Sequence, residues 1–90
     1  MDKVYVIQSY YNDDNETINQ GVFSRFDDAK EKATSLINDF KDDWDYNVVE
    51  ITDSNHLKMY GVNAVYVCNL EYDSNSPPAY EVTIFEEKVK

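Results

Sequence analysis

One stretch of the chain carries apolar residues at the spacing of an amphipathic helix. After Ser24, apolar side chains recur three and four residues apart, which places them on one helical face. These positions are Phe26, Ala29, Ala33, Leu36, Ile37, Phe40 and Trp44, and the polar residues Asp28, Lys32, Ser35 and Asp39 lie opposite. Ser24 is suited to cap the helix, with Asp27 accepting hydrogen bonds near the positive end of the helix dipole. The pattern predicts a helix that begins near Arg25.

Several other stretches favour strands because they are rich in β-branched and aromatic residues. They are residues 3–11, 18–24, 46–53, 62–72 and 79–87. The turn-rich residues 12–16 separate the first two and predict an opening β-hairpin, whereas residues 73–78 predict a loop before the last strand. The order along the chain is therefore β-β-α-β-β-β.

Alternation within the later strands predicts which side chains face the helix. In residues 62–72 the inward set is Val62, Ala64, Tyr66, Cys68, Leu70 and Tyr72, and the last strand adds Tyr80, Val82 and Ile84. The outward set is Asn63, Asn69, Glu71 and Asp73, together with Val65 and Val67. Such a division is typical of an antiparallel strand with one wetter side.

These elements predict an α+β fold in one domain spanning residues 1–90. We expect one antiparallel sheet of about five strands with one helix packed on one face. The other face has only partial polar cover. Tyr5, Ile7 and Tyr11 are expected to gather there with Val65 and Val67, where they would meet a partner or a second copy.

The charge balance narrows the classes of partner. The chain holds 18 Asp and Glu against 8 Lys and Arg, for a formal charge of -10, while 42% of its residues are hydrophobic. The hydrophobic content favours a folded domain over disorder. Nucleic acid and anionic membranes carry the same sign as the chain, so neither is expected as a direct partner, and a basic protein is favoured. The charge has a second interpretation, which is that it only keeps a small protein in solution.

Candidate catalytic and metal-binding groups are few. The chain has one His, His56, which is expected in a polar loop, and one Cys, Cys68, which is expected at an inward strand position, so no zinc spacing exists. Neither glycine lies in a Gly-rich phosphate-binding loop. We therefore expect no enzyme activity and no cofactor. The single cysteine excludes an internal disulfide, and there is no signal-peptide pattern and no apolar run of membrane-spanning length, which favours a cytosolic protein.

One acidic stretch imitates a calcium loop and then departs from it. Asp43, Asp45 and Asn47 alternate like the first ligands of an EF-hand. Val48 stands where the loop requires glycine, and Ser54 stands where a bidentate glutamate closes the site. No metal site is expected.

The acids form three clusters. Asp13, Asp14 and Glu16 mark the hairpin loop, Asp27, Asp28 and Glu31 open the helix, and Asp39, Asp42, Asp43 and Asp45 surround its end. The third cluster is unfavourable for stability because the end of a helix dipole is negative. One interpretation is that these are solvated turn residues. The other is that the third cluster and the hairpin acids bind a basic partner, with Trp44 and Tyr46 as flat anchors.

Rows of acids with this spacing can imitate nucleic-acid phosphates. Acids three or four residues apart on a helix lie about 5 to 6 Å from each other. A protein presenting such rows can occupy a nucleic-acid channel by satisfying the Lys and Arg groups that normally neutralise phosphates.

The overall profile resembles the small acidic proteins by which phages and mobile elements block host defence, including anti-CRISPR proteins and other DNA mimics. The length, the charge of -10, the Asn, Asp and Tyr richness and the lack of a catalytic set carry the resemblance. The front half, VYVIQSYY followed by GVFSRFDDAKEKATSLI, is also similar to small phage and bacterial domains in which a hairpin leads into a capped helix. The resemblance implies an inhibitor, acting in the host cytoplasm, of a nucleic-acid-processing protein such as a CRISPR effector nuclease.

A second hypothesis comes from the uncovered sheet face. A self-associating domain, for example a homodimer, or a small-ligand binder would use that face, and its oligomers would be insensitive to salt.

Overall fold

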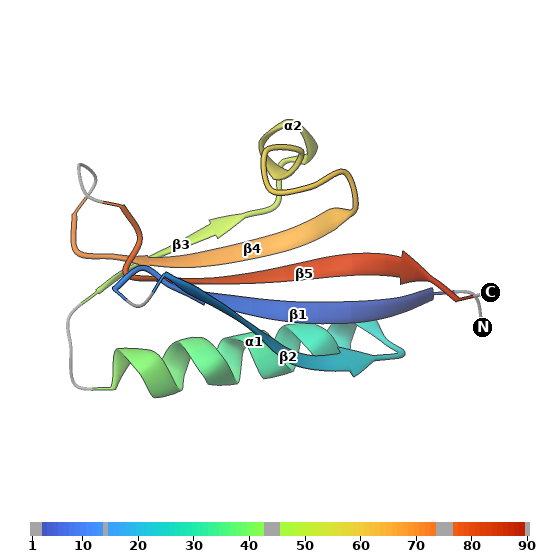
Figure 1. Cartoon of the computed structure of the whole chain (residues 1–90), viewed down its shortest axis with the longest axis horizontal. Coiled ribbons are helices and arrows are strands. Elements are labelled where there is room, and N and C mark those ends of the chain that lie inside the picture. The colour runs from blue at the N-terminus through green and yellow to red at the C-terminus, as the bar shows by residue number, and fades with distance from the viewer. Residues whose placement is uncertain (1–2, 14, 43–45, 74–76, 90) are drawn as a thin grey trace.

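The computed structural model describes residues 3–13, 15–42, 46–73 and 77–89. Within these residues, five strands form one antiparallel sheet in the spatial order β2-β1-β5-β4-β3 (Figure 1). The strands are β1 (Lys3–Tyr11), β2 (Glu16–Phe23), β3 (Asn47–Ile51), β4 (Ala64–Glu71) and β5 (Tyr80–Lys88). The helices are α1 (Phe26–Lys41) and the short α2 (Ser54–Leu57). The predicted α+β class, single sheet and covering helix are confirmed, whereas α2 lies in a stretch expected to be a loop.

The first and last strands hold the sheet together. β1 lies between β2 and β5, and it pairs with β5 along its whole length, from Lys3 opposite Lys88 to Tyr11 opposite Tyr80. The start of β1 and the end of β5 therefore lie at the same end of the molecule (Figure 1). No helix in the described part of the chain is long and apolar enough to cross a bilayer.

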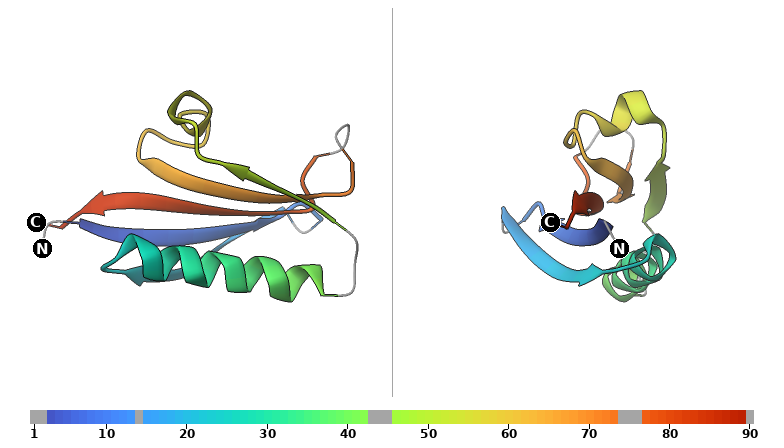
Figure 2. Two further views of the ribbon diagram at one scale, coloured as in Figure 1. Left: turned by 180° about the vertical axis from the view of Figure 1, so that it is seen from behind. Right: turned by 90° about the vertical axis from the view of Figure 1, so that its right-hand side faces the viewer.

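Helix α1 lies along one face of the sheet, and α2 lies on the other side, as the two views in Figure 2 show. The N-cap of α1 is Arg25, whose extended backbone precedes the helix and whose side chain makes no capping hydrogen bond. The predicted Ser24 cap is therefore wrong by one residue. The predicted acids Asp27 and Asp28 do lie in the first turn, where the helix dipole favours them.

The main core lies between α1 and the sheet face that we call the helix-side face. Ala29, Ala33 and Ile37 of α1 are buried there, with Phe26, Leu36 and Phe40 packed around them. The sheet contributes Ile7, Tyr66, Cys68, Leu70, Tyr80, Val82 and Ile84. This confirms the predicted helix face as far as Phe40, and Trp44 lies outside the described residues. Alternation placed the core positions of β4 and β5 correctly because both strands are regular in their central parts.

The predicted alternation fails at the start of β4. Val62 precedes the strand and is 98% exposed. The register between β4 and β5 shifts between Ala64 and Tyr66, so Val65 packs against the core under α1 while Ala64 packs on the other side. A bulge of this kind inserts one residue and reverses the faces that precede it. At the other end, Tyr72 lies beyond the strand and is mostly exposed.

The face turned away from α1, here called the opposite face, is not the apolar surface that the sequence suggested. Tyr5, Ile7 and Tyr11 belong to the core under α1, and Val65 packs against the same core. The predicted gathering of these residues with Val67 on the opposite face is therefore wrong. Alternation groups the odd residues of β1 together but does not say which face they take.

A second, smaller cluster covers part of the opposite face. Ile51, Leu57 and Val67 are buried there, with Tyr60 and Ala64 packed against them. Asp53 caps α2 by accepting a hydrogen bond from the backbone N–H of His56 at 3.1 Å. The cap and Leu57 together hold α2 over β3 and β4.

Candidate functional site

Aromatic rings from both layers meet at the C-terminal end of α1. Tyr11 and Tyr80 face each other across β1 and β5, with their ring centroids 4.8 Å apart. Phe40 of α1 stacks on Tyr80 at 4.4 Å with an interplanar angle of 6°, and it lies 5.4 Å from Tyr11. These rings form the floor of a pocket of about 490 Å³, lined by Tyr11, Leu36, Asp39, Phe40, Asp42 and Tyr80. We call it the aromatic–acidic pocket.

Two of the predicted acids, Asp39 and Asp42, line this pocket. Asp39 lies in the last turn of α1, and Asp42 is the C-cap, with a φ of 44° and its N–H donating to the Asn38 carbonyl at 3.0 Å. A positive φ is uncommon for a residue other than glycine, so the backbone turns sharply where the helix ends. Both side chains are exposed and lie near the negative end of the helix dipole, so they add to an existing negative potential. Burial raises the pKa of Tyr80 above its ordinary value, and the charge of Asp39 acts in the same direction.

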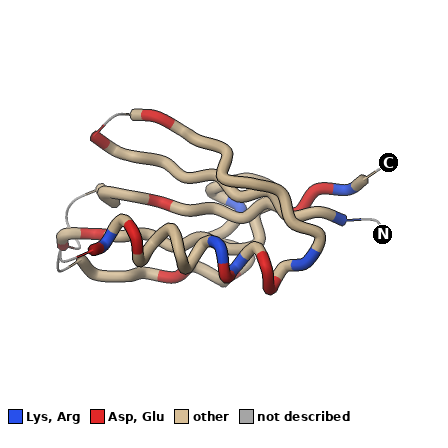
Figure 3. The backbone as a smooth tube through the Cα atoms, turned by 90° about the horizontal axis from the view of Figure 1, so that it is seen from below, with Lys and Arg blue, Asp and Glu red and all other residues tan. Residues whose placement is uncertain are grey.

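The hairpin acids lie at the same end of the molecule. The turn between β1 and β2 and the end of α1 are neighbours in Figure 1, and Figure 3 shows acidic residues gathered at that end. Glu16 is opposite Tyr11 in the β1–β2 register. Asp13 is close enough to Tyr46 for its charge to help raise the pKa of that phenol. The structure therefore brings Asp13 and Glu16 to the end where Asp39 and Asp42 lie.

Tyr46 has a different place from the one expected. It is 8% exposed, so its ring is not a free anchor for a partner. Its ring lies 5.8 Å from Phe40 and 4.8 Å from Tyr72, and the two tyrosine hydroxyls are 3.1 Å apart. The hydrogen bond with Tyr72, and then burial, raise the pKa of Tyr46 to about 12. Among the described residues at this end, the exposed aromatic residue is Tyr72, which the sequence placed under the helix.

Part of the predicted site lies outside the described residues. These positions are Asp14, Asp43, Trp44 and Asp45. The description of the site therefore rests on Asp13, Glu16, Asp39 and Asp42 and on the aromatic residues beside them. Tyr11 and Tyr80 were not predicted to belong to it.

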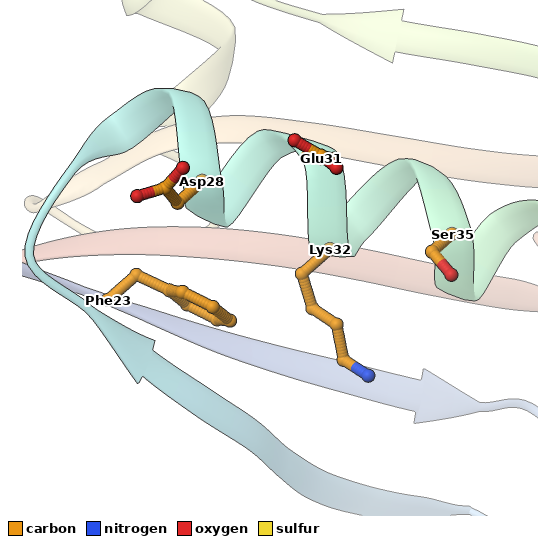
Figure 4. Close-up of a pocket in the computed structure, with 5 residues that line it drawn as sticks. All are labelled: Phe23, Asp28, Glu31, Lys32 and Ser35. Atoms are coloured by element: carbon orange, nitrogen blue, oxygen red, sulfur yellow. The ribbon is translucent and has the colours of Figure 1, made fainter.

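The acids at the other end of α1 have different surroundings. Asp28 and Glu31 line a pocket of about 460 Å³ between α1 and β2, together with Phe23, Lys32 and Ser35. Figure 4 shows Phe23 and Lys32 reaching into the space between the helix and the strand. Lys32 places a positive charge among these acids, so this pocket is of mixed charge, whereas the described charges lining the aromatic–acidic pocket are both negative.

The chemistry of the aromatic–acidic pocket is that of a cation site. Carboxylates accept hydrogen bonds from guanidinium and ammonium groups, and aromatic faces attract the same cations. Among the described residues, no group of three or more His, Cys, Asp or Glu side chains is placed to hold a metal ion. His56 is exposed on α2, and Cys68 is buried under α1, where burial raises the pKa of its thiol. Comparison of the chain with protein-family models, curated proteins and solved structures finds no match.

Proposed function

We propose that this protein is a non-catalytic inhibitor that binds basic side chains of a nucleic-acid-processing protein. The observation that carries the proposal is the aromatic–acidic pocket, where Asp39 and Asp42 stand beside the rings of Tyr11, Phe40 and Tyr80. Arg is the residue best matched to such a pocket, because its guanidinium both pairs with carboxylates and stacks on aromatic faces.

The arrangement favours a protein partner over nucleic acid itself. The pocket is acidic, the hairpin acids lie nearby, with Glu16 opposite Tyr11 and Asp13 close to Tyr46, and the whole chain carries a charge of -10. Phosphate groups would be repelled, whereas the Lys and Arg residues that neutralise phosphates would be attracted. A protein that occupies those residues competes with nucleic acid for the same surface.

The first target to test is a CRISPR effector nuclease, because the profile of the chain resembles that of anti-defence proteins. Such an inhibitor would act in the cytoplasm of the host cell. An effector has a positively charged channel that holds a nucleic-acid duplex through its backbone, which is the kind of surface an acidic protein can block.

The test compares two variants that remove the same charge from opposite ends of α1. One is Asp39→Asn with Asp42→Asn in the aromatic–acidic pocket, and the matched control is Asp28→Asn with Glu31→Gln. Binding to an effector, and to an Arg-rich peptide as a minimal probe, is measured at two salt concentrations. We expect the pocket variant to bind about tenfold more weakly and with a smaller salt dependence, because it lacks two groups that steer and hold a basic partner.

Folding is controlled by thermal melts of both variants. The pocket variant should be slightly more stable than the parent, by a few tenths of a kcal/mol per charge, because it relieves the helix dipole, and the control slightly less stable. Equal losses of binding in the two variants would mean that only net charge matters. Undiminished binding in the pocket variant would overturn the proposal.

A further inference from the structure

A second pocket lies on the opposite face of the sheet, away from α1. It has a volume of about 180 Å³, and its lining includes Gln8, Tyr10, Tyr60, Glu81, Thr83 and Phe85. The β5 residues of this set alternate with Tyr80, Val82 and Ile84, which are in the core under α1. The pocket is therefore separated from the helix-side core by the thickness of the sheet. We call it the Glu81 pocket.

Glu81 is a carboxylate without a partner in the middle of the sheet. It is half-buried, and burial raises its pKa. No described residue gives it a hydrogen bond or an ion pair. A carboxylate taken out of water is unfavourable unless a charged or hydrogen-bonding group compensates it. The chain itself does not supply that group in the part that the structure describes.

Asn69 is a second unsatisfied acceptor beside Glu81. The two residues are cross-strand partners on β4 and β5, so their side chains share the opposite face. Asn69 is 3% exposed, and its Oδ1 has no hydrogen-bond partner. Its Nδ2 donates to the Tyr60 hydroxyl at 3.5 Å, which is a long contact. Buried amide oxygens are nearly always satisfied, so this one marks a place where a donor is missing.

We infer that the Glu81 pocket binds a guanidinium group, carried by a free small molecule or by an arginine side chain of a protein partner. The guanidinium is a planar fork of five donors that can pair with both carboxylate oxygens of Glu81, the charged residue in the described lining of the pocket. Tyr10 and Tyr60 add aromatic faces that attract a cation. The inference is independent of the aromatic–acidic pocket, which lies on the helix-side face.

The size of the pocket limits the ligand to a group of this kind. Sites for drug-sized ligands are typically about 300 to 1,000 Å³, and this one is about 180 Å³. A side-chain head group therefore fits, and a nucleotide does not. A divalent metal ion is disfavoured as well, because Glu81 is the one carboxylate in the described lining and such ions prefer several oxygen ligands.

The experiment is a titration of ¹⁵N-labelled protein with N-acetylarginine methylamide, followed by NMR. The neutral citrulline analogue and the lysine analogue serve as matched ligands. We expect saturable shifts at Gln8, Tyr60, Glu81 and Thr83 with the arginine compound, about tenfold weaker binding of the lysine compound, and none of the citrulline compound.

Two variants locate the charge that matters. Glu81→Gln keeps the shape of the side chain and should weaken binding of the arginine compound about tenfold or more. Glu71→Gln is the control, because it removes the same charge from the same face outside the pocket lining. The Asp39→Asn, Asp42→Asn variant should bind the compound as the parent does at this site, which separates this test from that of the proposed function.

The source of the guanidinium is decided by a further comparison. An arginine-containing peptide that binds at least tenfold more tightly than the free compound assigns the pocket to a protein partner, and the reverse order assigns it to a small molecule. Equal binding of the citrulline compound, an equal effect of Glu71→Gln, or no saturable shift at Glu81 overturns the inference.

Discussion

The two faces of the sheet differ in whether their buried polar groups have hydrogen-bond partners. On the helix-side face, Ser9 is buried and accepts a hydrogen bond from Gln20 at 2.9 Å, and the Tyr66 hydroxyl donates to Glu50 at 2.5 Å. On the opposite face, the Oδ1 of the buried Asn69 has no partner, and Glu81 is half-buried without one. Among the described residues, the buried polar groups of the helix-side face thus have hydrogen-bond partners, whereas the opposite face leaves acceptors unsatisfied.

The covering elements account for this difference. Helix α1 is 16 residues long and buries a continuous apolar stripe against β1, β4 and β5. Helix α2 has 4 residues and covers the small cluster of Ile51, Leu57 and Val67 over β3 and β4. A short element covers little area, so the middle of the opposite face keeps polar side chains and a pocket. Stability is expected to depend mainly on the first face, and ligand recognition on what the second leaves open.

The largest expected effect comes from truncating a core residue on the helix-side face. Leu70 is fully buried under α1. Leu70→Ala should lower the free energy of unfolding by about 2 to 5 kcal/mol, because it removes apolar contacts and leaves a cavity. Denaturant melts measure the loss. A loss below about 0.5 kcal/mol would show that the helix-side face is not the main core.

The same truncation in the small cluster should have a smaller and more local effect. Leu57→Ala is expected to lower the free energy of unfolding by about 1 to 3 kcal/mol, because its cluster is at the surface and collapses more easily. Hydrogen exchange should become faster around α2 before the sheet is affected. If Leu57→Ala destabilised the protein more than Leu70→Ala, the ranking of the two faces would be reversed.

The helix and the sheet that it covers were predicted correctly from the sequence, whereas the side chains and the short helix on the opposite face were not. The apolar stripe from Phe26 to Phe40 is long enough to define a helix and its buried face. Four residues of α2 are too few to show a period. The bulge before Tyr66 leaves no mark in the alternation, which stays regular while the backbone adds a residue. The face taken by Tyr11 depended on pairing with β5, the last strand of the chain, which alternation does not reveal.

For the aromatic–acidic pocket, the acids were predictable and the aromatic floor was not. Asp39 and Asp42 stood out because carboxylates at a helix C-terminus oppose the dipole. Tyr11 and Tyr80 lie beside them only because β1 and β5, the first and last strands of the chain, pair with each other. Glu81, which lines the second pocket, comes to lie opposite Asn69 through the β4–β5 register in the same way.

The neighbour of Leu70 offers a matched test on the opposite face. Asn69→Leu replaces a buried, under-satisfied amide by an apolar group of similar shape. We expect stability to be unchanged or to rise by up to about 1 kcal/mol, because no strong hydrogen bond is lost and an unsatisfied acceptor is removed. Denaturant melts of the variant and the parent measure the change in the free energy of unfolding and its sign. A loss above about 2 kcal/mol would show that Asn69 makes hydrogen bonds that hold this face together.

The smallest expected effect is the pH dependence that Glu81 gives to stability. Burial raises its pKa in the folded protein above the ordinary value of 4.5, so between these two values the folded state holds a proton that the unfolded state has lost. Stability should therefore fall as the pH rises through this window, because the unfolded state releases the proton first. The stability of Glu81→Gln should equal that of the parent below pH 4.5 and be slightly higher above it. The control is Glu71→Gln, which shows the effect of removing one negative charge from an acidic chain.

Denaturant melts of the parent and both variants from pH 4 to 7 make the comparison. If the two variants showed the same pH profile, Glu81 would have found a partner in solution, and the contrast between the two faces would then rest on Asn69 alone.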